Sequence, residues 1–196
     1  MSGKLAEKSR MNAYHETRRA SFYHVSTELH VAGKLMGPFG VDDFNFFVGQ
    51  PAAGEHHVET EAILEQNRPR GEQTPRNKAI YLFESIEQCS WYGDRQHKND
   101  YFVYEVEAVT GRRLPMAIVD HIFRLYKNKG NGESISKAAY EYWNPGVKWR
   151  FFEFLCESCI VKSCTARNEL SCDSQRYAIT GMDYSLDLER CKSEFP

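Results

Sequence analysis

The chain has 196 residues, of which 41% are hydrophobic and 13% aromatic, and its formal charges sum to −2. This length suits one domain with a sizeable core, and the aromatic content argues against global disorder. A general electrostatic nucleic-acid binder shows a basic excess, so the charge balance disfavours that class. No apolar run approaches the ~20 residues that span a bilayer, so no membrane span is expected.

The N-terminal residues, 1–20, are polar and are expected to form a tail or a lead-in helix. They lack the apolar segment of a cleaved secretory signal. We therefore expect a cytoplasmic protein, or one that a specialised system exports into a target cell. Residues 21–185 are expected to form one domain, and residues 186–196 a loosely held C-terminus.

The first predicted strand covers residues 21–27, where Phe22, His24 and Ser26 alternate with Tyr23 and Val25. A Glu-rich helical segment at 59–66 follows. After it, residues 67–76 combine two prolines, a glycine and many charges, a composition typical of a mobile loop.

A second strand is predicted at 79–83, with Tyr81 at its centre. Ser85 and Gln88 then form a capping-box pattern that starts a short helix. Further predicted elements are strands at 101–109, 149–155, 159–161 and 177–180 and helices at 116–126 and 134–142.

This order of elements lacks a regular strand–helix alternation, so it indicates an α+β fold with a split, mostly antiparallel sheet and short flanking helices. Neither Gly-x-Gly-x-x-Gly nor Gly-x-x-x-x-Gly-Lys occurs. A nucleotide site in this chain would therefore be neither of the Rossmann nor of the P-loop type.

Three motifs resemble those of ADP-ribosyltransferases of the His-Tyr-Glu group, which includes the poly(ADP-ribose) polymerase catalytic domains, the diphtheria-type toxins and the rifampicin-modifying transferases. The sequence Phe-Tyr-His-Val-Ser at 22–26 is similar to the first motif of the group, although Val25 stands where the family has glycine. Ala-Ile-Tyr-Leu-Phe at 79–83 is similar to the second, with Tyr81 and Tyr92 spaced like the two nicotinamide-sandwiching tyrosines. The strand around Glu153 supplies the third.

The resemblance implies NAD as co-substrate, an ADP-ribosyltransferase-like β-core and a catalytic domain over 21–185. Glu153 would be the catalytic acid, since a carboxylate near the ribose stabilises the cation-like sugar of the transition state. His24 would bind a ribose hydroxyl, the Val25 backbone and Ser26 the nicotinamide amide, and Tyr81 and Tyr92 the faces of the nicotinamide ring.

Glu153 interrupts an aromatic run at 151–155, so its carboxylate must be solvated or paired. If Phe152 and Phe154 face the core, Glu153 points to the other face, which would simply be solvent. Glu157 is the rival acid, just past the strand.

The function expected from the resemblance is NAD-dependent mono-ADP-ribosylation of a protein acceptor by a bacterial toxin or effector. A small-molecule acceptor such as an antibiotic is the second interpretation, and a nucleic-acid acceptor the third. A non-catalytic nucleotide- or protein-binding module with the same fold, or an NAD hydrolase, are alternatives from other classes.

Four cysteines at 156, 159, 164 and 172 raise the question of a zinc site. Only one pair has knuckle-like spacing, Cys156 and Cys159. Without a secretory signal the default state is a reduced thiol, which packs as a small hydrophobe. No metal site is therefore predicted.

Overall fold

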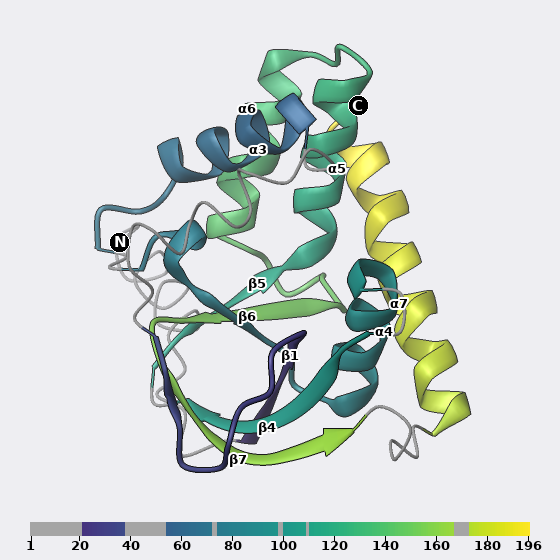
Figure 1. Ribbon diagram of the computed structural model, residues 1–196. Helices are drawn as coiled ribbons and strands as arrows, with labels where there is room; N and C mark the ends of the chain where they lie inside the picture. The colour runs from purple at the N-terminus through teal and green to yellow at the C-terminus, as the bar shows by residue number, and fades with distance from the viewer. Residues whose placement is uncertain (1–20, 38–53, 72–73, 98–99, 109, 167–172) are drawn as a thin grey trace, which may run out of the picture.

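The computed structural model describes residues 21–37, 54–71, 74–97, 100–108, 110–166 and 173–196 (Figure 1). The predicted N-terminal tail, residues 1–20, lies outside them. The described residues form two antiparallel sheets and a set of helices. The predicted α+β class is confirmed.

The larger sheet has four strands in the order β1-β4-β7-β2. In the central strand β4, the buried Tyr104, Val106 and Ala108 alternate with the partly exposed Glu105 and Glu107, the pattern of a sheet with one buried face. His24 lies opposite Tyr104 in the register of β1 and β4. The strands are β1 (Ser21–Ser26), β2 (Leu35–Met36), β4 (Phe102–Ala108) and β7 (Cys159–Ala166).

The smaller sheet has three strands in the order β3-β6-β5. Tyr81 lies opposite Leu155 and Leu114 lies opposite Glu153. Directly opposite residues share a face of a sheet, as do residues two apart in one strand. Tyr81 and Glu153 therefore lie on the same face. The strands are β3 (Ile80–Leu82), β5 (Arg112–Pro115) and β6 (Phe152–Cys156).

A single bridge between Tyr23 and Phe83 joins the two sheets on the side of β1. The two residues exchange both backbone hydrogen bonds, with N···O distances of 2.9 and 2.8 Å. On either side of this bridge no ladder connects β1 to β3 within the described chain, so the sheet is split there. This division agrees with the mostly antiparallel, split sheet that the sequence predicts.

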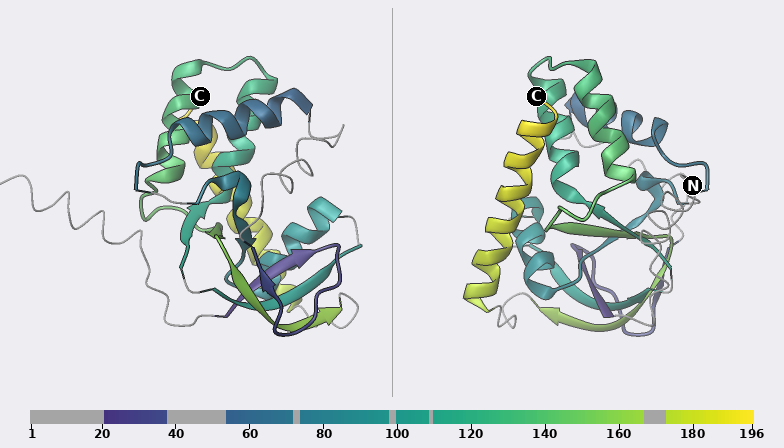
Figure 2. Two further views of the ribbon diagram at one scale, coloured as in Figure 1. Left: turned by 60° about the vertical axis from the view of Figure 1, so that its left-hand side comes forward. Right: turned by 180° about the vertical axis from the view of Figure 1, so that it is seen from behind.

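Helices α3, α5 and α6 gather at one end of the molecule, beside the three-stranded sheet (Figure 1). Helix α7 runs along one side from this group to the level of the four-stranded sheet (Figure 2). The helices are α3 (Gly54–Gln66), the 3₁₀ turn η1 (Arg76–Lys78), α4 (Ile86–His97), α5 (Met116–Lys127), α6 (Gly132–Trp143) and α7 (Ser174–Glu194).

Two apolar cores follow from this layering. One lies between the sheets, where the rings of Phe22 and Phe154 stack with their centroids 4.3 Å apart. The other lies on the opposite face of the three-stranded sheet and includes Phe151, Leu155 and Trp143. Strand β6 is consequently buried on both faces.

The predicted strands at 149–155 and 159–161 correspond to β6 and β7, whereas two predictions for residues 177–196 are wrong. Residues 177–180 form part of helix α7 rather than a strand, because a four-residue apolar run is ambiguous between the two periods. Residues 186–196 are not loosely held: Leu188, Cys191 and Phe195 are buried. Asp173 caps the helix by accepting from the N–H of Gln175.

Candidate active site

The most buried cluster of charge in the described chain surrounds Arg76, in the turn η1, whose side chain is 7% exposed. Its Nε lies 3.0 Å from Glu61 Oε1 on α3. Its Nη1 donates to Glu153 Oε1 on β6 and to the hydroxyl of Tyr142 on α6. The Tyr142 hydroxyl in turn donates to Glu153 Oε1 over 2.6 Å.

Two aromatic rings enclose the Arg76 guanidinium. Its carbon lies 5.0 Å from the ring centroid of Tyr81 and 5.3 Å from that of Tyr142, within the range of cation–π attraction. The Tyr81 hydroxyl also donates to the backbone oxygen of Arg76 over 3.0 Å. Arg76 therefore joins β3 and α6 as well as the two carboxylates.

His24 reaches this cluster from the other sheet. Its Nδ1 lies 2.9 Å from the backbone oxygen of Tyr81. A carbonyl oxygen only accepts hydrogen bonds, so Nδ1 carries the proton and Nε2 keeps its lone pair. Burial lowers the pKa of His24 to about 4, against a partial opposing effect of the Tyr81 carbonyl. The imidazole is thus neutral at pH 7 and presents Nε2 as an acceptor.

Burial raises the pKa of Glu153 above its usual value, while the positive charge of Arg76 and the hydrogen bonds from Tyr142 and Arg76 act against this rise. Burial also raises the pKa of the phenols Tyr81 and Tyr142 well above the usual value of 10.0. The two tyrosines remain uncharged donors at neutral pH.

The Glu153 side chain is 2% exposed, so the alternative that it points to solvent is wrong. Because both faces of β6 are covered, a carboxylate there is buried whichever way it points. Within the described part of the chain, both hydrogen bonds to the carboxylate end on Oε1. Oε2 retains its capacity to accept a hydrogen bond.

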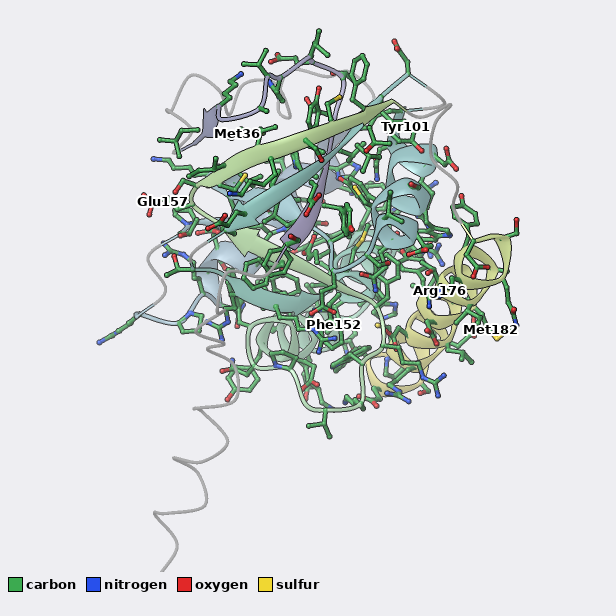
Figure 3. All side chains as sticks on the ribbon, turned by 90° about the horizontal axis from the view of Figure 1, so that it is seen from below. Met36, Tyr101, Phe152, Glu157, Arg176 and Met182 are labelled. Carbon is green, nitrogen blue, oxygen red and sulfur yellow. The ribbon has the colours of Figure 1, made fainter. Side chains whose placement is uncertain are left out.

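The rival acid Glu157 lies in the two-residue turn between β6 and β7 and is exposed. Figure 3 shows it at the periphery of the molecule. A carboxylate so placed is hydrated and lies outside the Arg76 cluster.

Val25 stands next to His24 on β1, and its side chain is 7% exposed within the core. Tyr23 bonds to Phe83 on the side away from β4, and residues two apart in an antiparallel ladder point their backbone groups the same way. The N–H and C=O of Val25 therefore point toward the side where the sheets part. The Val25 side chain belongs to the apolar core that also contains Phe83.

Ser26 ends β1 and is half-buried. Its Oγ accepts a hydrogen bond from the N–H of Glu28 over 3.0 Å. The hydroxyl hydrogen remains able to donate, as the predicted contact to an amide oxygen requires.

Tyr92 lies on α4, with its ring centroid 5.0 Å from that of Phe83. Its pKa is raised first by burial and then by the charge of Glu153. Tyr92 is thus close enough to Glu153 to sense its charge. In the described chain its ring contact is to Phe83, beside the bridge between the sheets.

The Arg76 cluster contains three residues that sequence reasoning missed: Glu61, Arg76 and Tyr142. Arg76 lies in the stretch predicted as a mobile loop, yet it is buried. Two signals pointed toward it, a carboxylate within an aromatic strand that needs a partner, and a tyrosine on the apolar face of α6. Neither signal identifies which arginine pairs with Glu153.

In the described ranges, no group of three or more His, Cys, Asp or Glu side chains is placed to hold a metal ion. Cys156 and Cys159 are buried thiols. Cys172, a member of the zinc set considered above, lies outside the described residues.

No protein-family model matches this sequence, and a search of curated proteins gave no significant match. Within the described residues, none of the helices combines the length and the apolar character needed to cross a bilayer.

Proposed function

We propose that this chain is an NAD-dependent mono-ADP-ribosyltransferase whose split sheet is an ADP-ribosyltransferase-like core. One observation supports this above all: a continuous series of contacts runs from His24 through Tyr81 and Arg76 to Glu153. These contacts cross the place where strands β1 and β3 separate. His24, Tyr81 and Glu153, which are 57 and 72 positions apart in sequence, are thus linked to one another through Arg76.

In this proposal NAD lies where the sheets part. His24 Nε2 accepts a hydrogen bond from a ribose hydroxyl, for which a neutral imidazole is needed. The backbone of Val25 and the hydroxyl of Ser26 bind the nicotinamide amide. Tyr81 and Tyr92 contribute ring surface to the nicotinamide.

Glu153 would act on the bond between nicotinamide and ribose. As this bond breaks, positive charge develops on the sugar, and a carboxylate held in a dry site stabilises it far more than one in water. Oε1 is held by Arg76 and Tyr142, while Oε2 is left to approach the ribose. The acceptor nucleophile then attacks the sugar as nicotinamide departs.

A protein acceptor, as in a toxin or effector, is the preferred substrate, followed by a small molecule. The balanced charge of the chain supports placing nucleic acid third.

The test is nicotinamide release from NAD by the purified protein, followed by chromatography. Glu153→Gln should lower the rate at least about 100-fold, as loss of a transition-state contact does. Glu157→Gln is the matched control, because this exposed carboxylate should be dispensable. Equal rates for Glu153→Gln and wild type would contradict the assignment. Mass spectrometry of a lysate treated with NAD and the protein separates transfer from hydrolysis.

The burial of Glu153 favours a second candidate, a module that binds a nucleotide without turnover. A side chain that is 2% exposed and fixed by two donors has the features of a structural ion pair as well. Calorimetric binding of NAD without nicotinamide release would favour this candidate over the enzyme.

A further inference from the structure

Three charged side chains from three elements are joined by two ion pairs that share one cation, Arg76. Arg76 bonds through Nε to Glu61 and through Nη1 to Glu153. The Glu61 side chain is 30% exposed, and that of Glu153 is 2% exposed. The ion pairs therefore connect a partly exposed glutamate side chain on α3 with the buried carboxylate on β6.

A guanidinium is suited to this arrangement because its separate nitrogens bind different partners in a fixed plane. The rings of Tyr81 and Tyr142 hold that plane. A lysine ammonium lacks this planar fork of donors. Binding Glu61 and Glu153 through separate nitrogens in one plane requires arginine, whereas neutralising their charges would not.

From this geometry we propose that Arg76 is a positioning residue for Glu153, and that Glu61 sets how strongly Arg76 acts on it. The inference rests on the proposed function, since Glu153 is there the catalytic carboxylate. It adds a control of that carboxylate from helix α3, which does not itself carry any residue of the proposed NAD site.

The groups that face Glu153 act on it in opposite directions. The positive charge of Arg76 and the hydrogen bond from Tyr142 lower the pKa of Glu153, whereas the negative charge of Glu61 raises it. Tyr81 from β3 and Tyr92 from α4 are uncharged at neutral pH, because their pKa values are raised. Removing Arg76 should therefore raise the pKa of Glu153, and neutralising Glu61 should lower it.

The experiment compares kcat for nicotinamide release against pH in the full chain and in three variants. Glu153 must be ionised to stabilise the sugar cation, so activity falls on the acid side of its titration. Arg76→Gln and Tyr142→Phe should move this acid limb to higher pH. Glu61→Gln should move it to lower pH. At neutral pH, kcat of Arg76→Gln should fall on the order of 100-fold, with KM for NAD changed much less.

The matched control is Arg113→Gln. Arg113 lies on β5 and forms an ion pair with Glu84 in which both side chains are at least 40% exposed. Its loss should leave the acid limb in place. Circular dichroism melting of every variant separates folding from activity.

A merely structural ion pair would lower the melting temperature of the variants without moving the acid limb in opposite directions. The proposal would be overturned if the acid limb of the kcat profile shifts in the same direction in Arg76→Gln and Glu61→Gln, or does not shift in either. If Arg76→Gln does not fold, Tyr142→Phe and Glu61→Gln provide the same opposed pair.

If the wild-type chain releases no nicotinamide, the proposed function fails but the control of Glu153 is still measured. NMR titration of chains labelled with ¹³C at the glutamate carboxyl carbons follows Glu153 directly, with Glu153→Gln used for assignment. A higher midpoint in Arg76→Gln or Tyr142→Phe and a lower one in Glu61→Gln support the inference. Unchanged midpoints contradict it.

Discussion

At the scale of single residues, the site depends on the protonation state of His24. The imidazole donates through Nδ1 to Tyr81 and has a pKa of about 4, below the usual 6.5. The folded state therefore prefers the neutral form more strongly than the unfolded state does. The resulting stabilisation is fully present above about pH 6.5 and is lost as the pH falls toward 4.

We predict that wild-type protein loses more stability between pH 7 and pH 4 than His24→Asn does. Asparagine keeps a donor near the position of Nδ1 but does not titrate. Urea unfolding at several pH values measures the difference. Other histidines with lowered pKa values, such as His30 and His121, contribute equally to both proteins. Parallel stability curves for the two proteins would rule the prediction out.

The sequence identified the positions of His24, Tyr81 and Glu153 within strands because each stands in a short alternating or aromatic run. It did not identify Arg76 or Glu61. Their role depends on a contact 77 positions apart, between Arg76 and Glu153, and on where α3 packs. Local periodicity contains no information about such distant pairs, so only the folded chain reveals them.

At the scale of elements, α4 owes its position to a close approach between Gly93 and Tyr101. A Cβ at residue 93 would lie 2.7 Å from two atoms of the Tyr101 ring. The Tyr101 hydroxyl is held by Ser90 O at 3.1 Å and Asp94 Oδ1 at 3.0 Å. The ring is therefore fixed, and the helix that carries Tyr92 packs directly on it.

Gly93→Ala should destabilise the protein by about 1 kcal/mol. Replacing a helical glycine by alanine gains up to about 1 kcal/mol, but overpacking against a fixed ring costs about 1–3 kcal/mol. Chemical denaturation measures the difference. Gly132→Ala at the start of α6 is the control, because a Cβ there meets no atom within 4 Å. A more stable Gly93→Ala would show that the Tyr101 ring moves aside.

The start of α4 was accessible from sequence, because its signals are local. The Gln88 N–H donates to Ser85 Oγ over 3.2 Å, and the Glu84 N–H donates to the Gln88 side chain over 3.2 Å. The first bond is the one that Ser85 as N-cap predicts, whereas the Gln88 side chain accepts from Glu84, one residue before the N-cap, rather than from Ser85 itself. Helix α7 is not predicted, because the run at 177–180, which begins only four residues after the cap Asp173, also fits a short strand.

At the scale of the whole molecule, α7 ties the helices to the strand that carries Glu153. Asp187 Oδ2 accepts from the N–H groups of Arg150 and Phe151, both over 2.8 Å, just before β6 begins. Beyond the helix, Phe195 is 2% exposed, and its backbone oxygen lies 2.8 Å from Nε2 of His121 on α5. The C-terminus thus packs against α5 and into the larger apolar core.

Phe195→Ala should therefore cost about 3–5 kcal/mol, as loss of a fully buried aromatic ring does. Leu186→Ala, in α7 and with a side chain 45% exposed, is the control and should cost less than about 1 kcal/mol. Urea denaturation measures both. Equal losses of stability in the two variants would indicate that the C-terminus is loosely held, as its sequence suggests.

The link between the two sheets has a mechanical consequence. Strand β6 belongs to the smaller sheet and β7 to the larger, and only residues 157–158 separate them. So short a connection prevents the sheets from moving apart along that margin. Any widening between the sheets must therefore pivot about this turn and occur at the margin beside β1 and β3, where the reciprocal backbone hydrogen bonds of Tyr23 and Phe83 and the bond from His24 Nδ1 to the Tyr81 oxygen join the two strands.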